Sequence, residues 1–391
     1  MPEVSVWQSA AAPRPRLLSP KPVPAPGPTS YLTQLDGLRF VAVLLVLVDH
    51  WLAERNKLPL GPLGVTIFFV LSGFLISRIL LSSKDKHGKR PGGLGFYLRT
   101  FYIRRTLRIF PLYYLVILAL ALAHIPPVRE TLAWNLLYAT NLYIASHQSW
   151  MGSIDHFWSL AVEEQVYLFF PLLLFFVPRR HVVLTMLLMI TGAVASRYVL
   201  FATGQPWMVG YVSTICCLDA FGLGGLLAYL FLYERDRFEK LFQNSALVVA
   251  ALLAFVLVVA YAKTYPEVHN IQTEVWERLA GSVLGMTLVG RSAVGFTGGV
   301  KWLFEHAVCR YLGQISYGLY IFHNFVFNAY HTPVSHPTVQ LWNRLAALFP
   351  PGADLMVVKL FFLFGLTTLL ASASWHLFEK PINSLKDIFS Y

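Results

Sequence analysis

Apolar segments long enough to cross a bilayer recur along this chain, separated by short polar loops. A transmembrane helix needs about 20 predominantly apolar residues. We predict ten such segments, near residues 36–53, 64–82, 108–124, 157–177, 182–201, 213–233, 245–262, 277–291, 311–331 and 356–379. The pattern therefore predicts an all-α fold, a polytopic integral membrane bundle of about ten transmembrane helices.

An eleventh apolar stretch, from Trp134 to Ile144, is shorter than the others. Its length is more typical of a re-entrant or interfacial helix than of a full span. Counting it as a span would also move Arg179 and Arg180 to the outer side. We therefore keep ten spans in the prediction.

Basic residues cluster in alternate loops, which sets the expected orientation. The loop after the second predicted span is the most basic, with Lys84, Lys86, Lys89, Arg90, Arg99, Arg104 and Arg105. By contrast, the loop at 202–212 holds no Lys or Arg, and the segment 125–156 holds only Arg129. Ten spans place every strongly basic loop in the cytoplasm and both termini there as well.

Composition agrees with a membrane protein. Of 391 residues, 56% are hydrophobic and 13% are charged, and a soluble domain would carry about twice that share of charge. The net charge is +11, but its cations lie in short loops, so we expect contact with the lipid bilayer and no nucleic-acid partner. The three cysteines lack metal-ligand spacing and are expected to be free thiols.

The predicted domain organisation is simple. Residues 1–30 carry eight prolines and predict a disordered, Pro-rich cytoplasmic tail. Residues 31–385 form the transmembrane domain, and residues 386–391 form a short cytoplasmic tail. With no long soluble stretch between the spans, any chemistry is expected inside the bundle.

The first span carries ionisable residues on one face. Arg39 and His50 are eleven residues apart, or about three helical turns and roughly 16 Å along the axis. Asp36 lies one turn before Arg39 and can pair with it. This face offers a cation near the cytoplasmic end and an imidazole near the outer end. A snorkelling arginine and an interfacial histidine explain the same pattern.

The fourth span contains two adjacent carboxylates, Glu163 and Glu164, inside an apolar helix. Acids near a helix N-terminus are stabilised by its dipole, which offers a purely structural reading. The predicted topology also places them at the outer end, level with His50. A carboxylate close to an imidazole orients it and stabilises its charged form.

Two further groups remain open from the residues alone. The cytoplasmic segment around Arg104, Arg105 and Arg108 alternates cations with aromatics. It fits either a lipid-anchoring helix or a site for the phosphates of a nucleotide-bearing donor. His323, in the middle of the ninth predicted span, fits a hydrogen-bonded core residue as well as a catalytic one.

Several enzyme classes are disfavoured by missing motifs. The sequence has no Walker phosphate loop, no Gly-x-Ser-x-Gly elbow and no His-Glu-x-x-His pair. An ATP-driven pump, a serine hydrolase and a zinc protease are therefore not expected.

Four segments occur in a fixed order along the chain. They are Asp36-Gly37-Leu38-Arg39 with His50 eleven residues after Arg39, Phe68-Phe69-Val70-Leu71-Ser72-Gly73-Phe74-Leu75-Ile76, Arg104-Arg105-x-x-Arg108-Ile109-x-Pro111, and Phe157-Trp158-Ser159-Leu160-x-Val162-Glu163-Glu164-Gln165. In these segments the chain resembles the acyltransferase-3 family of membrane proteins, over about residues 31–385. This family includes O-acetylases of bacterial surface polysaccharides and of macrolide sugars. Ser316-Tyr317 with His323 is a weaker fifth match. One departure is Thr66, where the family often has an acidic residue.

The resemblance implies an O-acyltransferase that uses cytoplasmic acetyl-coenzyme A, or another acyl-coenzyme A, and no metal. His50 would be the general base, oriented by Glu163 or Glu164. Donor binding would fall to Arg39, Arg104, Arg105 and Arg108. Further candidate site residues are Asp36, Ser72, Trp158, Tyr317 and His323.

The expected acceptor is a sugar hydroxyl of an envelope polysaccharide, a lipopolysaccharide or a lipid-linked precursor, reached from a multi-pass position in the cell membrane. The absence of an appended soluble domain implies direct transfer. Two alternatives stay open: a transporter of a lipid-linked or acylated carbohydrate without chemistry, and an O-acyltransferase acting on a small molecule such as a macrolide. Whether the protein forms a homo-oligomer is also left open.

Overall fold

The computed structural model describes residues 31–88, 92–350 and 353–389, and these residues are helical with no strands. The predicted tail at 1–30 lies outside the described residues. Six segments are long and apolar enough to cross a membrane, or up to eight if two bent helix pairs each count as one span. This confirms the all-helical membrane fold, while the number of spans and the side of the termini stay predictions.

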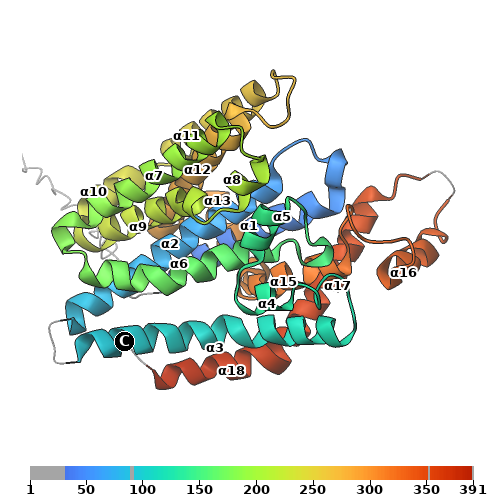
Figure 1. Ribbon diagram of the computed structural model, residues 1–391, viewed down its shortest axis with the longest axis horizontal. Coiled ribbons are helices and arrows are strands. Elements are labelled where there is room, and N and C mark those ends of the chain that lie inside the picture. The colour runs from blue at the N-terminus through green and yellow to red at the C-terminus, as the bar shows by residue number, and fades with distance from the viewer. Residues whose placement is uncertain (1–30, 89–91, 351–352, 390–391) are drawn as a thin grey trace, which may run out of the picture.

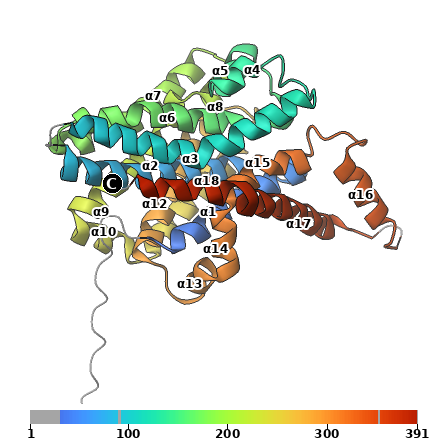
Figure 2. The ribbon, with the colours of Figure 1, turned by 90° about the horizontal axis from the view of Figure 1, so that it is seen from below.

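In Figure 1 the segments at Gly93–Leu122 and Phe157–Phe176 run roughly along the long axis of the molecule. Four of the six segments are built on α2 (Leu60–His87), α3 (Gly93–Leu122), α6 (Phe157–Phe176) and α7 (Val182–Ala202). The other two are built on α9 (Leu218–Tyr233) and α17 (Met356–Ser374), which continues through a π-helical turn into α18 (Lys380–Ser384). In Figures 1 and 2, α18 lies beside α3.

The bent pairs combine α10 (Arg235–Phe242) with α11 (Ala246–Ala262), and a segment containing α12 (Glu277–Val294) with α13 (Gly298–Glu305). The first helix, α1 (Gln34–Leu52), is apolar in its middle but carries Asp36, Arg39 and Asp49. It packs against α2 in the centre of the bundle. Short helices α8 (Trp207–Val212) and α16 (Pro337–Ala346) occupy connecting segments.

The short apolar stretch at Trp134–Ile144 forms no continuous helix. It is divided between α4 (Leu132–Leu136) and α5 (Thr140–His147). The uninterrupted helix predicted over 311–331 is wrong. The chain instead forms α14 (Ala307–Gln314) and α15 (Ser316–Val326), with a break at Ile315 and extended backbone at Phe327. After that break the chain returns to α1, where the Ala329 amide donates to the carbonyl of His50 at 3.0 Å.

Small residues allow the central helices to approach closely. A Cβ on Gly224 of α9 would lie 2.3 Å from the carbonyl oxygen of Val70 in α2. A Cβ on Gly313 of α14 would lie 1.9 Å from the carbonyl oxygen of Asp36 in α1. Helices in membranes associate through such close packing, since lipid tails are as apolar as the side chains themselves. These contacts hold α1, α2 and α9 in fixed positions at the core.

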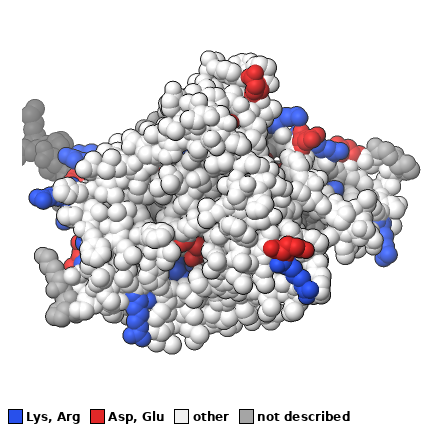
Figure 3. All heavy atoms as spheres, in the orientation of Figure 1, with Lys and Arg blue, Asp and Glu red and all other residues white. Residues whose placement is uncertain are grey.

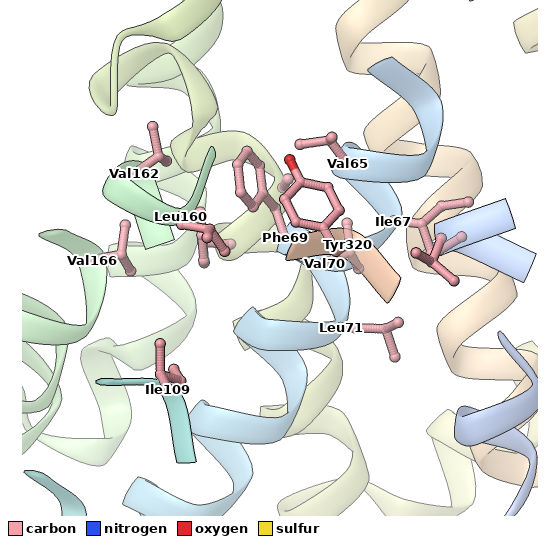
Figure 4. Packing of buried hydrophobic residues seen from close by; sticks show 14 of the residues in the cluster. Val65, Ile67, Phe69, Val70, Leu71, Ile109, Leu160, Val162, Val166 and Tyr320 are labelled. Atoms are coloured by element: carbon pink, nitrogen blue, oxygen red, sulfur yellow. The ribbon is translucent and has the colours of Figure 1, made fainter. Parts of the chain in front are cut away.

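The surface and the core fit a bilayer environment. Figure 3 shows a face largely free of charged side chains, as expected for surface in contact with lipid tails. Inside, α2, α6 and α15 meet in a packed apolar layer. Figure 4 shows Phe69 and Tyr320 next to each other in this layer, with Val65 and Leu160 nearby. This layer lies beside the candidate site.

Candidate functional site

His50, near the end of α1, pairs with a second histidine. Its Nδ1 lies 2.7 Å from Nε2 of His323 in α15, and the two rings stack with centroids 5.0 Å apart and an angle of 12°. His323 is fully buried. The break before α15 and its early end position this ring against α1. Two histidines from distant parts of the sequence therefore form one hydrogen-bonded pair.

The partners of the pair determine which nitrogens carry protons. Nδ1 of His323 lies 2.6 Å from the carbonyl oxygen of Tyr320, which can only accept, so this nitrogen carries hydrogen. In a neutral His323, Nε2 is then an acceptor, and Nδ1 of His50 must donate to it. A neutral His50 is left with a lone pair on Nε2. That arrangement suits a general base.

A third histidine, His156, supports the pair from the start of α6. Its ring meets the His323 ring edge-on, with centroids 4.9 Å apart. Its Nε2 lies 3.2 Å from the carbonyl oxygen of Ile321, and its Nδ1 lies 2.9 Å from the amide nitrogen of Asn324. The carbonyl of that asparagine accepts from Asn328 at 2.9 Å. These buried contacts fix the orientation of His156 without ionising it.

The glutamates do not take the position expected from the sequence. Glu163 accepts hydrogen bonds from the hydroxyls of Ser72 and Tyr167. One carboxylate oxygen of Glu164 is buried without a hydrogen-bond partner. Among the described residues, neither carboxylate hydrogen-bonds to His50, whose ring partner is His323. The predicted glutamate–histidine contact is thus replaced by a histidine–histidine contact.

Glu163 instead belongs to a cavity of about 110 Å³ between α1, α2, α3, α6 and α15, here called the donor-side cavity. Three of the predicted donor-binding arginines line it, Arg39, Arg105 and Arg108. Arg39 is paired with Asp36 at 2.5 Å, and the Arg105 guanidinium lies 4.8 Å from the centre of the Tyr167 ring. Polar lining also includes Ser72, Ser159, Ser316, Tyr317 and Tyr320.

A second cavity of about 170 Å³ adjoins the donor-side cavity, and we call it the entry cavity. Arg39, Arg108 and Tyr317 line both. Asp36, Glu379 and Lys386 also line the entry cavity, which opens beside α18. The two cavities therefore lie side by side, and their shared wall carries the guanidinium groups of Arg39 and Arg108.

Two predicted residues point elsewhere. Arg104 does not line either cavity; its Nη1 donates to the carbonyls of Lys386 and Phe389 at 2.9 and 2.8 Å, so it holds the chain that follows α18. Trp158 lies 5.0 Å from Tyr211, ring centre to ring centre, and lines a different cavity. Tyr317 lies in both cavities while its hydroxyl donates to the carbonyl of Ile109 at 2.8 Å.

Tyr320 lies between the donor-side cavity and the histidines, a role that the sequence did not reveal. It lines the cavity, and its ring centre lies 5.5 Å from that of His323. Its hydroxyl is 2.5 Å from Oγ of Ser159 and donates to the carbonyl of His156 at 3.0 Å. The only sequence signal was its position one turn before His323 in an aromatic run.

An ion pair outside the candidate membrane-spanning helices fixes the loop next to His50. His331, in the loop after α15, lies 2.5 Å from Oδ2 of Asp155, just before α6. The hydrogen bond to Asp155 raises the pKa of His331 above its usual range, and burial raises the pKa of Asp155. The pair holds the loop that contacts the His50 carbonyl. Among the described residues no group of three or more His, Cys, Asp and Glu could hold a metal ion.

Comparison with known proteins gives one family. The model described as "Acyltransferase domain", of the acyltransferase-3 family, matches residues 32–376. Peptidoglycan O-acetyltransferase OatA of Listeria monocytogenes is 27% identical over 377 residues, covering 90% of this chain and 56% of the relative. The "Putative peptidoglycan O-acetyltransferase YrhL" of Bacillus subtilis is 27% identical over 379 residues, covering 90% of this chain and 55% of the relative.

The chain thus spans just over half the length of these relatives. No solved structure matches it. The family match covers all four segments that carry the resemblance and includes His323.

Proposed function

This chain belongs to the acyltransferase-3 family, and on that premise we propose that it transfers an acetyl group from cytoplasmic acetyl-coenzyme A to a hydroxyl of an envelope glycan. The observation that carries the proposal is the convergence of Arg39, Arg105, Arg108 and Glu163 on one cavity beside the His50–His323 pair. Family membership supports acyl transfer in general. The donor, the acceptor and the role of each residue are the proposed parts.

The donor binds from the basic end of the bundle. Its phosphates lie at the entry cavity, where Arg39, Arg108 and Lys386 supply positive charge. The thioester arm then extends into the donor-side cavity, which holds the acetyl end of the molecule. Arg108 is available for this role, since within the described residues it forms no hydrogen bond or salt bridge.

His50 acts on the acceptor. Its Nδ1–H is held by Nε2 of His323, so its own Nε2 accepts the proton of the incoming hydroxyl. The hydroxyl oxygen forms a bond to the thioester carbonyl carbon while the carbon–sulfur bond breaks. His50 then returns the proton to the departing thiolate, which leaves as coenzyme A. The products are the acetyl ester and the free thiol, and no other reactant is needed.

Peptidoglycan is the acceptor we propose, because it is named for the relatives OatA and YrhL. Its glycan lies outside the cell membrane, which agrees with the predicted position of His50 near the outer end of α1. The proposal therefore places the protein in the cell membrane, with the donor on one side and the acceptor on the other.

The test uses the full chain in lipid nanodiscs with radiolabelled acetyl-coenzyme A and a soluble peptidoglycan glycan fragment. Native protein is expected to form a labelled, base-labile ester on the glycan. Removing a general base lowers the rate by about 10²–10⁴-fold, so His50→Ala is expected to lose that much activity. His181→Ala, at an exposed histidine before α7, is the matched control and stays active. Full activity of His50→Ala would refute the base, and no ester from the native protein would refute glycan transfer.

A further inference from the structure

Two more cavities lie at the end of the bundle where α1 ends and α2 begins. One, of about 30 Å³, reaches from Pro59 and Pro62 to Trp158, and the other, of about 160 Å³, reaches to Trp207. Both are lined by Pro62, Tyr211, Glu277 and Arg278. We treat them as one space and call it the aromatic vestibule. It lies at the His50 end of α1, away from the entry cavity.

Aromatic rings in several orientations frame the vestibule. Trp207 stacks on His269 with centroids 4.2 Å apart and an angle of 9°. Tyr211 meets Trp207 edge-on at 5.7 Å and lies tilted against Trp158 at 5.0 Å. Rings of this kind present flat apolar faces that pack against the C–H face of a pyranose ring. Binding sites combine such surfaces with a few polar groups that fix the ligand's orientation.

The polar groups favour a ligand that donates hydrogen bonds. Glu274 and Glu277 line the vestibule, and within the described residues neither side chain forms a hydrogen bond or salt bridge, although Lys263 and Arg278 attract Glu277 through charge. Arg278 is already engaged, because it donates to the carbonyl of Gly210 at 2.6 Å and to Sγ of Cys217 at 3.0 Å. The oxygens of these two carboxyl groups can accept hydrogen bonds from sugar hydroxyls.

The vestibule also adjoins the donor-side cavity. Val65 and Phe69 line both spaces, so a ligand in the vestibule is separated from the proposed acetyl position by one layer of side chains. The Phe69 ring meets Trp158 edge-on at 6.2 Å on the vestibule side. An occupant of the vestibule therefore lies where an acceptor must approach.

We propose that the aromatic vestibule binds a neutral sugar unit of the acceptor glycan, with Trp207 and Tyr211 against its ring and Glu277 accepting from its hydroxyls. Identifying this sugar as the acceptor rests on the proposed function. Binding of the sugar does not require transfer, so the two can be tested separately.

The first measurement is direct binding without donor. The full chain in nanodiscs is titrated calorimetrically with a soluble disaccharide prepared from peptidoglycan glycan strands. An aromatic contact of this kind is worth about a factor of ten in affinity, so Trp207→Ala is expected to weaken binding by about tenfold. Glu277→Gln, which keeps the side-chain shape, is expected to weaken it several-fold. Trp302→Ala, at an exposed tryptophan of α13, is the control and binds like the native chain.

The second measurement is steady-state transfer. The vestibule variants are expected to raise KM for the disaccharide and leave KM for acetyl-coenzyme A unchanged. Trp207→Phe, which keeps an aromatic face, is expected to bind the sugar more tightly than Trp207→Ala. This difference would show that the loss in Trp207→Ala comes from the missing ring and not from misfolding. If Trp207→Ala and Glu277→Gln bind the disaccharide like the native chain, or if glycerol phosphate competes with it, the vestibule proposal is overturned. If the disaccharide binds as proposed but no ester forms, the vestibule stands and the transfer proposal fails.

Discussion

At the scale of single residues, the orientation of the His50 ring depends on its hydrogen-bond partner. Its Nδ1 contacts an imidazole where a carboxylate was expected. A carboxylate would add a negative charge beside the base in a poorly solvated place, whereas a neutral imidazole adds none. The His50 ring is therefore held in place without a buried carboxylate. Burying such a charge inside a helix bundle is costly. In the proposed mechanism His323 is therefore a positioning residue for His50.

The first prediction concerns that position. His323→Leu removes the acceptor for Nδ1–H of His50 and is expected to lower kcat by about 10–100-fold, by analogy with metal-bound imidazoles that lose the partner orienting them. His323→Gln offers an amide oxygen to the same N–H and is expected to recover much of the rate. The pH–rate profile should change shape in the Leu variant only. Equal kcat and equal profiles for the two variants at equal thermal stability would contradict the positioning role.

Arg104 and Arg108 give a second prediction. They belong to one sequence motif, but Arg108 lines both cavities while Arg104 lines neither. Arg108→Ala is expected to raise KM for acetyl-coenzyme A about tenfold, since a charge-assisted hydrogen bond to a phosphate is worth roughly 1.5–3 kcal/mol. Arg104→Ala is the matched control, because its guanidinium contacts the carbonyls of Lys386 and Phe389. Its KM for the donor should stay near that of the native protein. A larger effect from Arg104 than from Arg108 would reverse the assignment.

At the scale of elements, the sequence correctly predicts features that depend on residue spacing within one helix. Arg39 and His50 belong to one helix, so periodicity alone puts them on a shared face. His323 is 273 residues from His50 in the chain, and no local pattern reports a contact over that separation. The break at Ile315 was missed for a similar reason. The apolar run continues across it, while the close approach of Gly313 to α1 is a tertiary feature.

The loop between α15 and α16 gives a third prediction at this scale, on pH. The pKa of His331 is raised by Asp155. A group whose pKa is raised on folding contributes stability that is fully present below its unfolded value, here 6.5, and lost as the pH rises through the raised value. We therefore expect this loop to resist proteolysis at pH 6 and to be cut faster at pH 9.

Limited proteolysis in nanodiscs, followed by mass spectrometry of fragments near residue 331, measures the effect. His331→Gln cannot ionise and should show the same cleavage rate at both pH values. His147→Gln, at an exposed histidine that stacks on Tyr143, should keep the pH dependence of the native loop. A native loop that is cut equally at pH 6 and pH 9 would argue against the ion pair.

At the scale of the whole molecule, the proposed function requires the two ends of the bundle to face different compartments. The entry cavity lies near α18 and the basic loops, and the aromatic vestibule lies near the end of α1. An even number of spans before each basic loop gives this arrangement. The loop charges support it, and direct labelling can test it.

The fourth prediction is therefore on topology. Arg129→Cys and Arg180→Cys place a thiol at exposed positions in loops predicted to face opposite sides. The native cysteines are buried and should react slowly. In intact cells, a membrane-impermeant maleimide is expected to label position 129 and to reach position 180 only after permeabilisation. Labelling of position 180 in intact cells would show that the span count is wrong.

The apolar layer formed by Phe69, Tyr320, Val65 and Leu160 has a further consequence. Val65 and Phe69 of this layer line both the donor-side cavity and the aromatic vestibule, so in the proposed arrangement the layer separates the donor from the acceptor. A continuous column of water there would short-circuit the membrane potential, because hydrophobic constrictions are what keep ions out of such passages. In the proposed arrangement the rings of Phe69 and Tyr320 would therefore also keep ions from crossing the bundle. If the proposed function holds, this layer must admit an acetyl group passing from the cytoplasmic donor to the outer acceptor while it stays closed to protons.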